Sequence, residues 1–251
     1  MISKNKLKYY SSLLKKKNRD IQKKFLAEGL KTIEEGLNSN FTCEVVLVTE
    51  EYGATYNEFP RKYNVLIETV IKDDFKKLTD TVTPQGIAAV FGYPQPHNIN
   101  NIKSRLIVCL ENVADPGNLG TIIRNCDWFG VTDIVLSKNC ADPYSPKTVR
   151  SSMGSIFHVN IYEETDLIEF LQDFRKKGYR VLCADTDGKS IYEYRSDGND
   201  IMIFSSEAHG PSVDILTSSD YRITIPRFGN GESLNVASAS AVILSCVARK
   251  L

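Results

Sequence analysis

The sequence predicts an α/β fold, and three observations carry that prediction. From residue 106 onward, short apolar runs alternate with segments whose apolar residues have helical spacing. The first of these runs, Leu106–Leu110, is apolar throughout, as in a strand buried on both faces of a parallel sheet. Polar segments follow several of these runs, at the edge where such sheets bind ligands. We therefore expect a parallel sheet covered by helices.

Composition places the chain among globular proteins. Of its 251 residues, 42% are hydrophobic and 25% are charged. No apolar run approaches the ~20 residues of a membrane span, and the basic start lacks the apolar core of a signal peptide. The sequence therefore predicts a cytoplasmic protein with no membrane partner.

Cysteine and histidine spacing predicts no metal site. None of the six cysteines belongs to a CxxC pair, and the three histidines show no ligand spacing. We interpret the cysteines as buried free thiols in a reducing compartment. They are Cys43, Cys109, Cys126, Cys140, Cys183 and Cys246.

The N-terminal part predicts a small α/β domain. The pattern indicates one helix over 19–37, a short helix over 71–78, and strands over 41–48, 64–67 and 85–91. The next ten residues, 92–101, hold two prolines and three asparagines and predict a linker. We therefore expect one domain over 1–97 and a second over 104–251.

Residues 1–31 are strongly basic. They hold ten Lys or Arg against two acidic residues, which gives 10 − 2 = +8. Such a block suits neutralisation of nucleic-acid phosphates. A solvated amphipathic helix would explain the same charge run.

The C-terminal part alternates further strands and helices. The predicted strands are 106–110, 133–136, 157–161, 179–184, 200–204 and 221–225. The predicted helices are 119–129, 146–153, 166–177 and 235–249.

The first candidate for chemistry follows strand 106–110. Asp115-Pro116-Gly117-Asn118 is a turn that leads into a helix, and Arg124 lies six residues after Asn118 among apolar neighbours. A guanidinium there is either directed at an anion or paired with Glu111 or Asp127. The residues alone leave both readings open.

Two further segments follow strands. Residues 185–190 lack the spacing of a P-loop, and no GxGxxG occurs in the chain. Residues 205–212 hold Ser206, Glu207 and His209, which would suit a hydrolase. The nucleophile elbow GxSxG is missing, however, and this weighs against hydrolysis.

The last polar segment spans residues 225–239. It contains Pro226, two glycines at 229 and 231, and then Ser233 and Asn235 before a helix rich in small residues. A glycine turn with a helix N-cap explains this pattern without any ligand. The same glycines would also let a ligand approach the main chain closely.

Taken together, three stretches resemble the motifs of the SpoU-type, TrmH-like RNA 2′-O-ribose methyltransferases of the SPOUT superfamily. They are Asn118…Arg124, Glu207…Gly210, and Ile225-Pro226…Ser233-Leu234-Asn235-Val236. The N-terminal part, with Phe25–Gly29 and Thr83–Val90, resembles the ribosomal-protein-L30e-like substrate-binding domain found in many members.

The resemblance implies S-adenosylmethionine as cofactor, bound in a deep C-terminal trefoil knot. The implied cofactor-binding residues are Ala184, Asp185, Ser205, Glu207, Gly210, Ile225, Pro226, Ser233, Leu234 and Asn235. The implied catalytic residues are Arg124, Asn118, Glu207, Ser233 and Asn235. It also implies RNA as the substrate, ribosomal RNA ahead of transfer RNA, and a homodimer in which the small-residue face of the last helix contacts its partner. That face would equally suit packing within the chain.

Arginine is a poor base because its guanidinium stays protonated. We therefore expect Arg124 to hold the phosphate beside the target ribose and to stabilise the developing oxyanion. The other four catalytic candidates would orient Arg124 and the ribose.

The sequence departs from the family at Ser205, where the second motif usually begins with glycine. A side chain there could crowd the cofactor. The alternative function is therefore an RNA-binding protein that keeps the fold and is impaired in methyl transfer.

Overall fold

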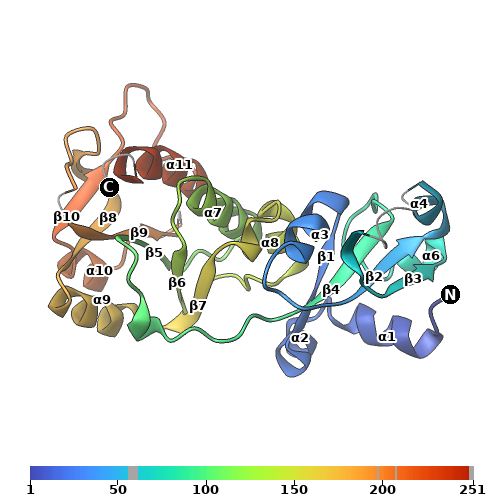
Figure 1. Ribbon diagram of the computed structural model, residues 1–251. Coiled ribbons are helices and arrows are strands. Elements are labelled where there is room, and N and C mark those ends of the chain that lie inside the picture. The colour runs from blue at the N-terminus through green and yellow to red at the C-terminus, as the bar shows by residue number, and fades with distance from the viewer. Residues whose placement is uncertain (56–61, 197, 207, 249–251) are drawn as a thin grey trace. The chain divides into compact units, whose positions relative to one another are not determined.

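The computed structural model describes residues 1–55, 62–196, 198–206 and 208–248. The chain divides into two units, which Figure 1 draws as ribbons. The first unit consists of Met1–Pro96 together with Asp142–Phe157, and the second of His97–Ala141 together with His158–Leu251. The predicted division into domains 1–97 and 104–251 stays a prediction.

The first unit is built on a four-stranded sheet in the order β1-β4-β2-β3. Strand β4 is antiparallel to β1 and β2, whereas β2 and β3 are parallel. The elements of this unit are α1 (Lys4–Ser12), α2 (Lys16–Gln22), β1 (Lys24–Glu28), α3 (Leu30–Leu37), β2 (Cys43–Thr49), α4 (Glu50–Thr55), β3 (Ile67–Val70), α6 (Lys72–Phe75), β4 (Ile87–Gly92), α8 (Pro146–Ser151) and the 3₁₀ turn η2 (Ser155–Phe157).

The prediction of one helix over 19–37 was wrong. Residues 24–28 form β1, which pairs along its whole length with β4, at least 60 residues away. Lys23 before this strand has a left-handed backbone with φ 51°, and Gly29 after it has φ 96°. The apolar spacing suited a helix, but pairing with a distant strand overrode it. The predicted strand 64–67 is also shifted, because β3 begins only at Ile67.

Both faces of this sheet carry buried apolar side chains. One face packs against α1, through a cluster that includes Leu7, Tyr10 and Leu13. On the other face, Phe91 of β4 contacts Phe157, with 4.8 Å between ring centroids. A Cβ atom on Gly36 of α3 would lie 2.5 Å from the Phe91 ring, so only glycine fits at this approach.

A buried ion pair joins the segment 142–157 to the rest of the first unit. Arg19 is 3% exposed and its Nε donates to Asp142 Oδ2 at 3.2 Å. Its Nη1 donates to the main-chain oxygen of Leu13 at 2.8 Å. Helix α8 in this segment contacts β1. The prediction of a strand over 157–161 was wrong, because Phe157 ends η2 and β7 begins at Asn160.

The second unit is built on a six-stranded sheet in the order β10-β8-β9-β5-β6-β7. All five strand pairs are parallel, which confirms the predicted α/β class. The trefoil knot stays a prediction. The elements are η1 (Ile99–Asn101), β5 (Leu106–Glu111), α7 (Pro116–Trp128), β6 (Asp133–Ser137), β7 (Asn160–Thr165), α9 (Leu167–Lys176), β8 (Tyr179–Ser190), β9 (Asn199–Ser205), α10 (Val213–Thr217), β10 (Tyr221–Thr224) and α11 (Val236–Val247).

Helices cover both faces of this sheet. Figure 1 shows α7 and α11 on one side and α9 and α10 on the other. Leu167, Phe170, Leu171 and Phe174 of α9 are buried in one cluster with strand residues such as Val181 and Ile201. The continuous apolar runs of the sequence are therefore strands buried on both faces.

Candidate active site

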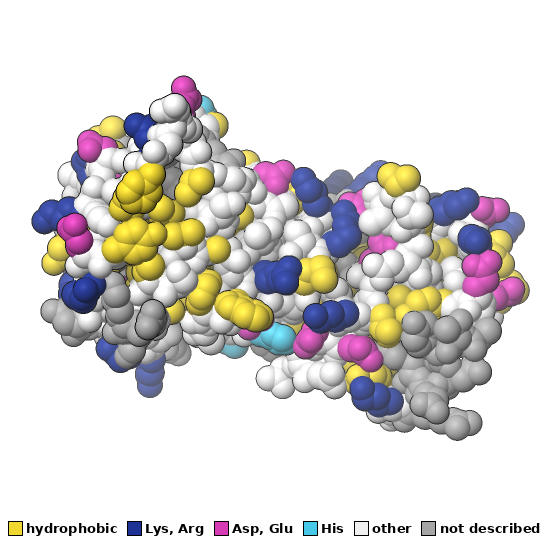
Figure 2. Space-filling view, turned by 90° about the horizontal axis from the view of Figure 1, so that it is seen from above, with side chains coloured by type: hydrophobic (Ala, Val, Ile, Leu, Met, Phe, Trp, Pro, Cys, Tyr) yellow, Lys and Arg dark blue, Asp and Glu magenta, His cyan; other side chains and the backbone are white. Residues whose placement is uncertain are grey.

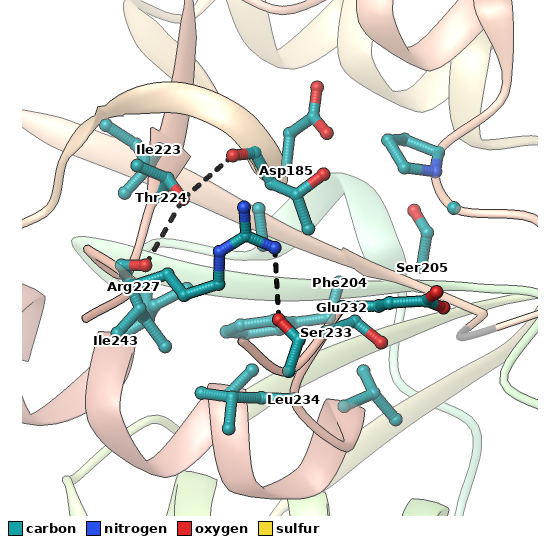
Figure 3. A pocket seen from close by; sticks show the side chains of 18 of the residues that line it. Asp185, Phe204, Ser205, Ile223, Thr224, Arg227, Glu232, Ser233, Leu234 and Ile243 are labelled. Carbon is teal, nitrogen blue, oxygen red and sulfur yellow. Dashed lines mark hydrogen bonds between the residues drawn. The ribbon is translucent and has the colours of Figure 1, made fainter. Parts of the chain in front are cut away.

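A cavity of about 1010 Å³ opens at the carboxyl ends of β8, β9 and β10. Residues of the β10–α11 loop and of the first turns of α11 complete its lining. Figure 3 shows the side chains that surround it. Its size is at the upper end of the roughly 300–1,000 Å³ range of small-molecule sites. The position matches the sequence prediction that ligands bind beyond the strand ends.

An irregularity in β8 forms one wall of the cavity. Cys183 pairs with Arg222 of β10, but the next residue of β10, Ile223, pairs with Lys189. The residues of β8 between these two pairs therefore bulge out of the ladder, and Ala184, Asp185 and Thr186 line the cavity from there. Gly188 is required by this geometry, since a Cβ atom on it would lie 2.7 Å from the main chain of Arg222.

The cavity is apolar on one side and polar on another. Phe204, Ile223 and Ile243 are buried and line it. Asp185 adds a carboxylate whose side chain is 15% exposed, 3.9 Å from the guanidinium of Arg222. Arg227 in the β10–α11 loop donates to the main-chain oxygen of Gly231 at 3.0 Å, a contact drawn in Figure 3.

Ser205 lies in the lining, at the last position of β9. Its backbone φ is negative, so the position tolerates a side chain without strain. The hydroxyl donates to Glu111 Oε2 at 2.9 Å. The side chain that replaces the usual glycine is therefore engaged with a neighbouring strand.

The structure brings two candidates from distant parts of the chain together. Asn235 is the N-cap of α11, and its Oδ1 accepts from the N–H groups of Ala237 and Ser238. The Nδ2 of Asn235 donates to Asn118 Oδ1 at 3.0 Å. Asn118 lies in the first turn of α7, whose N-cap is Asp115. The first and third motifs thus meet where two helices begin.

Packing of α7 against α11 holds this meeting point in place. Asn125 of α7 donates to the main-chain oxygen of Ala237 and to Ser240 Oγ, both at 2.9 Å. Arg124, the preceding residue, is exposed. Asp127 lies 3.1 Å from His158, and the carboxylate of Glu111 accepts from Ser205 and Ser212. Among the described residues, neither acid forms an ion pair with Arg124, so its guanidinium can be directed at an anion.

Most of the predicted site residues line the cavity. Those that do are Ala184, Asp185, Ser205, Gly210, Ile225, Pro226, Ser233 and Leu234. Asn118, Arg124 and Asn235 are not among the lining residues, although Asn235 lies between Leu234 and Val236, which are. Glu207 lies outside the described residues.

Several lining residues were missed by the sequence analysis. Phe204 ends the predicted strand 200–204, and Thr224 is the second-last residue of the predicted strand 221–225, so their position at the carboxyl edge was an available signal. Arg227 lies in the predicted turn. Ile243 reaches the cavity from the second turn of α11, and nothing in its apolar spacing distinguished it from a core residue.

Burial disfavours the thiolate form of three cysteines. Burial, with the charges of Asp185 and Glu111, raises the pKa of the Cys183 thiol to about 12. Burial also raises the pKa of the Cys109 and Cys126 thiols. The prediction that all six are buried was wrong in part, because Cys43, Cys140 and Cys246 are half-buried.

The described residues contain no helix that is both long and apolar enough to cross a membrane.

Comparison with known proteins identifies both parts of the chain. Residues 105–245 match the SpoU rRNA Methylase family, and residues 4–89 match the MRM3-like substrate binding domain. A Bacillus subtilis relative, the 23S rRNA (guanosine(2553)-2′-O)-methyltransferase RlmP, is 32% identical over 95% of this chain and 94% of its own.

Solved structures agree with these matches. The crystal structure of an AdoMet-bound rRNA methyltransferase from Sinorhizobium meliloti has a TM-score of 0.85 at 26% identity, over 99% of this chain and 95% of that one. A structure concerned with 2-OH methylation on tRNA has a TM-score of 0.53 at 26% identity, and covers only 58% of this chain and 95% of its own. With its family match over more than half its length and a relative that aligns from end to end, the chain belongs to the SpoU rRNA methylase family.

Proposed function

We propose that this protein transfers the methyl group of S-adenosylmethionine to a ribose 2′-hydroxyl of ribosomal RNA. The observation that carries the proposal is the cavity at the carboxyl ends of β8, β9 and β10, lined by the second and third family motifs. Its neighbours Asn118 and Asn235 join the first motif to the third.

The residues that line the cavity fit this cofactor. Phe204, Ile223 and Ile243 offer an apolar surface for a purine ring, and the Asp185 carboxylate can accept hydrogen bonds from ribose hydroxyls. Main-chain groups near Gly210 and in the β10–α11 loop are available for polar contacts. When bound, the cofactor supplies an electrophilic methyl group on a sulfonium and leaves as S-adenosylhomocysteine.

Arg124 is proposed to act on the RNA. Its exposed guanidinium is suited to grip the phosphate next to the target ribose and to stabilise negative charge as the 2′-hydroxyl loses its proton. Asn118 and Asn235, bonded to each other, would fix the helix starts around it. Ser233 and Glu207 are proposed to orient the ribose. Holding the reacting atoms at near-attack distance supplies a large part of such a rate enhancement.

The share of this chain that aligns with each relative favours ribosomal RNA over transfer RNA as the substrate. The rRNA methyltransferase RlmP aligns with 95% of this chain, including the part that matches the substrate-binding domain. The structure concerned with 2-OH methylation on tRNA aligns with 58% of this chain. Lysines of the first unit, among them Lys8, Lys15 and Lys17, are exposed and suited to phosphate contacts.

We also propose a homodimer formed through α11. The predicted small-residue face divides in two: Ala237 is buried beside α7, whereas Ser238 and Ser245 are exposed and Ala241 is half-buried. Figure 2, seen from the side of these helices, shows hydrophobic side chains gathered on the second unit. Trp128 at the end of α7 is 80% exposed. A contact between two copies would cover such a surface.

We also propose that the protein acts in the cytoplasm, because a reducing compartment suits its free thiols.

The direct test is methyl transfer in vitro. The protein is incubated with tritiated S-adenosylmethionine and rRNA from cells that lack the protein, and the digested RNA is examined for 2′-O-methylnucleosides. The proposal expects one such nucleoside at a single site, and tRNA from the same cells should remain unlabelled. Cofactor binding without any transfer to RNA would favour the impaired RNA-binding alternative instead.

A further inference from the structure

The second unit holds a buried carboxylate beside the cavity that the proposed reaction does not use. Glu111 is the last residue of β5 and is 7% exposed. Its side chain is not part of the cavity lining among the described residues. A buried carboxylate is costly unless hydrogen bonds compensate for the water it loses. Its partners therefore indicate what it is for.

Both ends of one loop are bonded to Glu111. Oε2 accepts the hydroxyl of Ser205 at 2.9 Å and the N–H of Ser212 at 3.1 Å. The main-chain oxygen of Glu111 accepts the N–H of Ser206 at 3.0 Å. One residue of β5 thus anchors the loop where it leaves β9 and again where it enters α10.

The loop between these anchors is a wall of the cavity. Ala208, His209, Gly210 and Pro211 line it. The main chain of Gly210 is set by a left-handed φ of 62° and by a bond from its N–H to the Ser206 oxygen at 2.8 Å. Figure 3 places Ser205 at one edge of the cavity and Arg227 at the other. The wall therefore takes its position from residues that are themselves bonded to Glu111.

We propose that Glu111 is a positioning residue for the cofactor, and that the Ser205 hydroxyl is one of the groups through which it holds the loop. The inference rests on the proposed function, because it assigns this wall to S-adenosylmethionine. In this account the serine that stands in place of the usual glycine fixes the binding site and does not obstruct it.

Two substitutions at Ser205 separate positioning from obstruction. Positioning predicts that Ser205→Ala and Ser205→Gly both weaken cofactor binding, since each removes the hydroxyl. Obstruction predicts that Ser205→Gly binds more tightly than the wild type and that Ser205→Ala is unchanged. Loss of one hydrogen bond to a charged group should raise the Kd about tenfold.

Substitutions at Glu111 test the same link from the other side. Glu111→Gln keeps an acceptor oxygen and should weaken binding less than Glu111→Ala. In a background with Glu111→Ala, adding Ser205→Ala should change the Kd little further, because the two groups act through one bond. Binding of S-adenosylmethionine and of S-adenosylhomocysteine is measured by calorimetry on the full chain, and kcat at saturating cofactor should stay within about twofold of the wild type.

Ser219→Ala is the matched control. Ser219 follows α10, and its hydroxyl donates to the main-chain oxygen of Ile215 at 2.7 Å. The variant therefore loses one hydroxyl hydrogen bond in the same unit, at a residue that does not line the cavity. Its Kd should equal that of the wild type.

Three results would overturn the inference. The first is an unchanged Kd in both Ser205 variants, even with a lower melting temperature, since Glu111 would then have a structural role only. The second is tighter binding by Ser205→Gly. The third, a wild-type protein that binds no cofactor at millimolar concentration, would overturn the proposed function as well. If Glu111→Ala fails to fold, the Ser205 variants still decide between the outcomes.

Discussion

Two carboxylates at the amino edge of the six-stranded sheet differ from Asp185 at its carboxyl edge. At the amino edge, Asp200 is fully buried and accepts from Arg180 and Tyr194, and Asp133 is 6% exposed and accepts from Asn160 and Tyr162. At the carboxyl edge, Asp185 faces the cavity with one ion-pair distance of 3.9 Å to Arg222. Asp200 and Asp133, with their saturated partners, indicate a role in stability, whereas Asp185, which faces the cavity, is suited to a ligand.

The largest effect is expected from breaking the amino edge. Asp200→Ala leaves Arg180 without its carboxylate, which was bonded through two nitrogens at 3.0 and 2.8 Å. Loss of one partner of a buried pair costs about 3–5 kcal/mol of unfolding free energy. Denaturation followed by circular dichroism measures this loss. The exposed pair of Asp173 and Lys176 supplies the control, because Asp173→Ala should leave the transition almost unchanged. Equal effects of the two variants would contradict the contrast between buried and exposed carboxylates.

In contrast to Asp200→Ala, the variant Arg124→Ala should keep its stability and lose methyl-transfer activity. Removal of a group that stabilises a developing oxyanion typically lowers kcat about 10²–10³-fold. Since Arg124 is exposed, the melting temperature and the cofactor Kd should stay near the wild-type values. Lys176→Ala, which removes an exposed positive charge from α9, is the control and should transfer methyl groups normally. Near wild-type kcat for Arg124→Ala would remove Arg124 from the mechanism.

Gly188→Ala tests the bulge of β8 at the carboxyl edge. A Cβ atom there would meet main-chain atoms of Arg222 at 2.7 Å, and these cannot move without disturbing the β8–β10 ladder. Overpacking of this kind costs about 1–3 kcal/mol. Because the bulge carries Asp185, we expect weaker cofactor binding in addition, measured by calorimetry. Gly198→Ala is the control, since nothing lies within 4 Å of a Cβ built on it. Unchanged cofactor binding and stability for Gly188→Ala would show that the bulge of β8 accepts a side chain at this position.

Asn235→Ala should have a smaller effect on stability than Asp200→Ala and Gly188→Ala, and a specific effect on activity. It removes the N-cap of α11, which is typically a loss of about 0.5–2 kcal/mol, and the bond to Asn118. Asp166→Ala removes the N-cap of α9, which accepts from two N–H groups in the same way. Both variants should lose similar stability, whereas only Asn235→Ala should lower methyl transfer. Equal activity of the two would mean that Asn235 is a cap and nothing more.

The parallel sheet was predictable because its central strands β5 and β9 contain continuous apolar runs. Even so, the strand expected at 157–161 begins at Asn160, since Phe157 packs against Phe91 in the first unit. The segment 19–37 was not predictable from its spacing, because its central strand exists only through pairing with β4. The spacing of apolar residues along the sequence predicts strands that are buried along their length. It does not predict a strand that forms only by pairing with a distant segment.

The site could be predicted in part from strand ends and in part from family resemblance. The strand ends pointed to Ala184, Asp185 and Ser205, which line the cavity. The bond between Asn118 and Asn235 joins residues 117 positions apart, and no spacing rule gives such a contact. The role of Glu111 was hidden as well, because it follows from three hydrogen bonds and from no motif.

Methyl transfer to rRNA, compared between the wild type and Arg124→Ala, tests the central claim most directly. The account predicts that the wild type forms a 2′-O-methylnucleoside from tritiated S-adenosylmethionine, and that Arg124→Ala binds the cofactor equally well and forms about 10²–10³-fold less per unit time. Label in a base, or equal transfer by both proteins, would contradict the assignment of a ribose methyltransferase that works through Arg124.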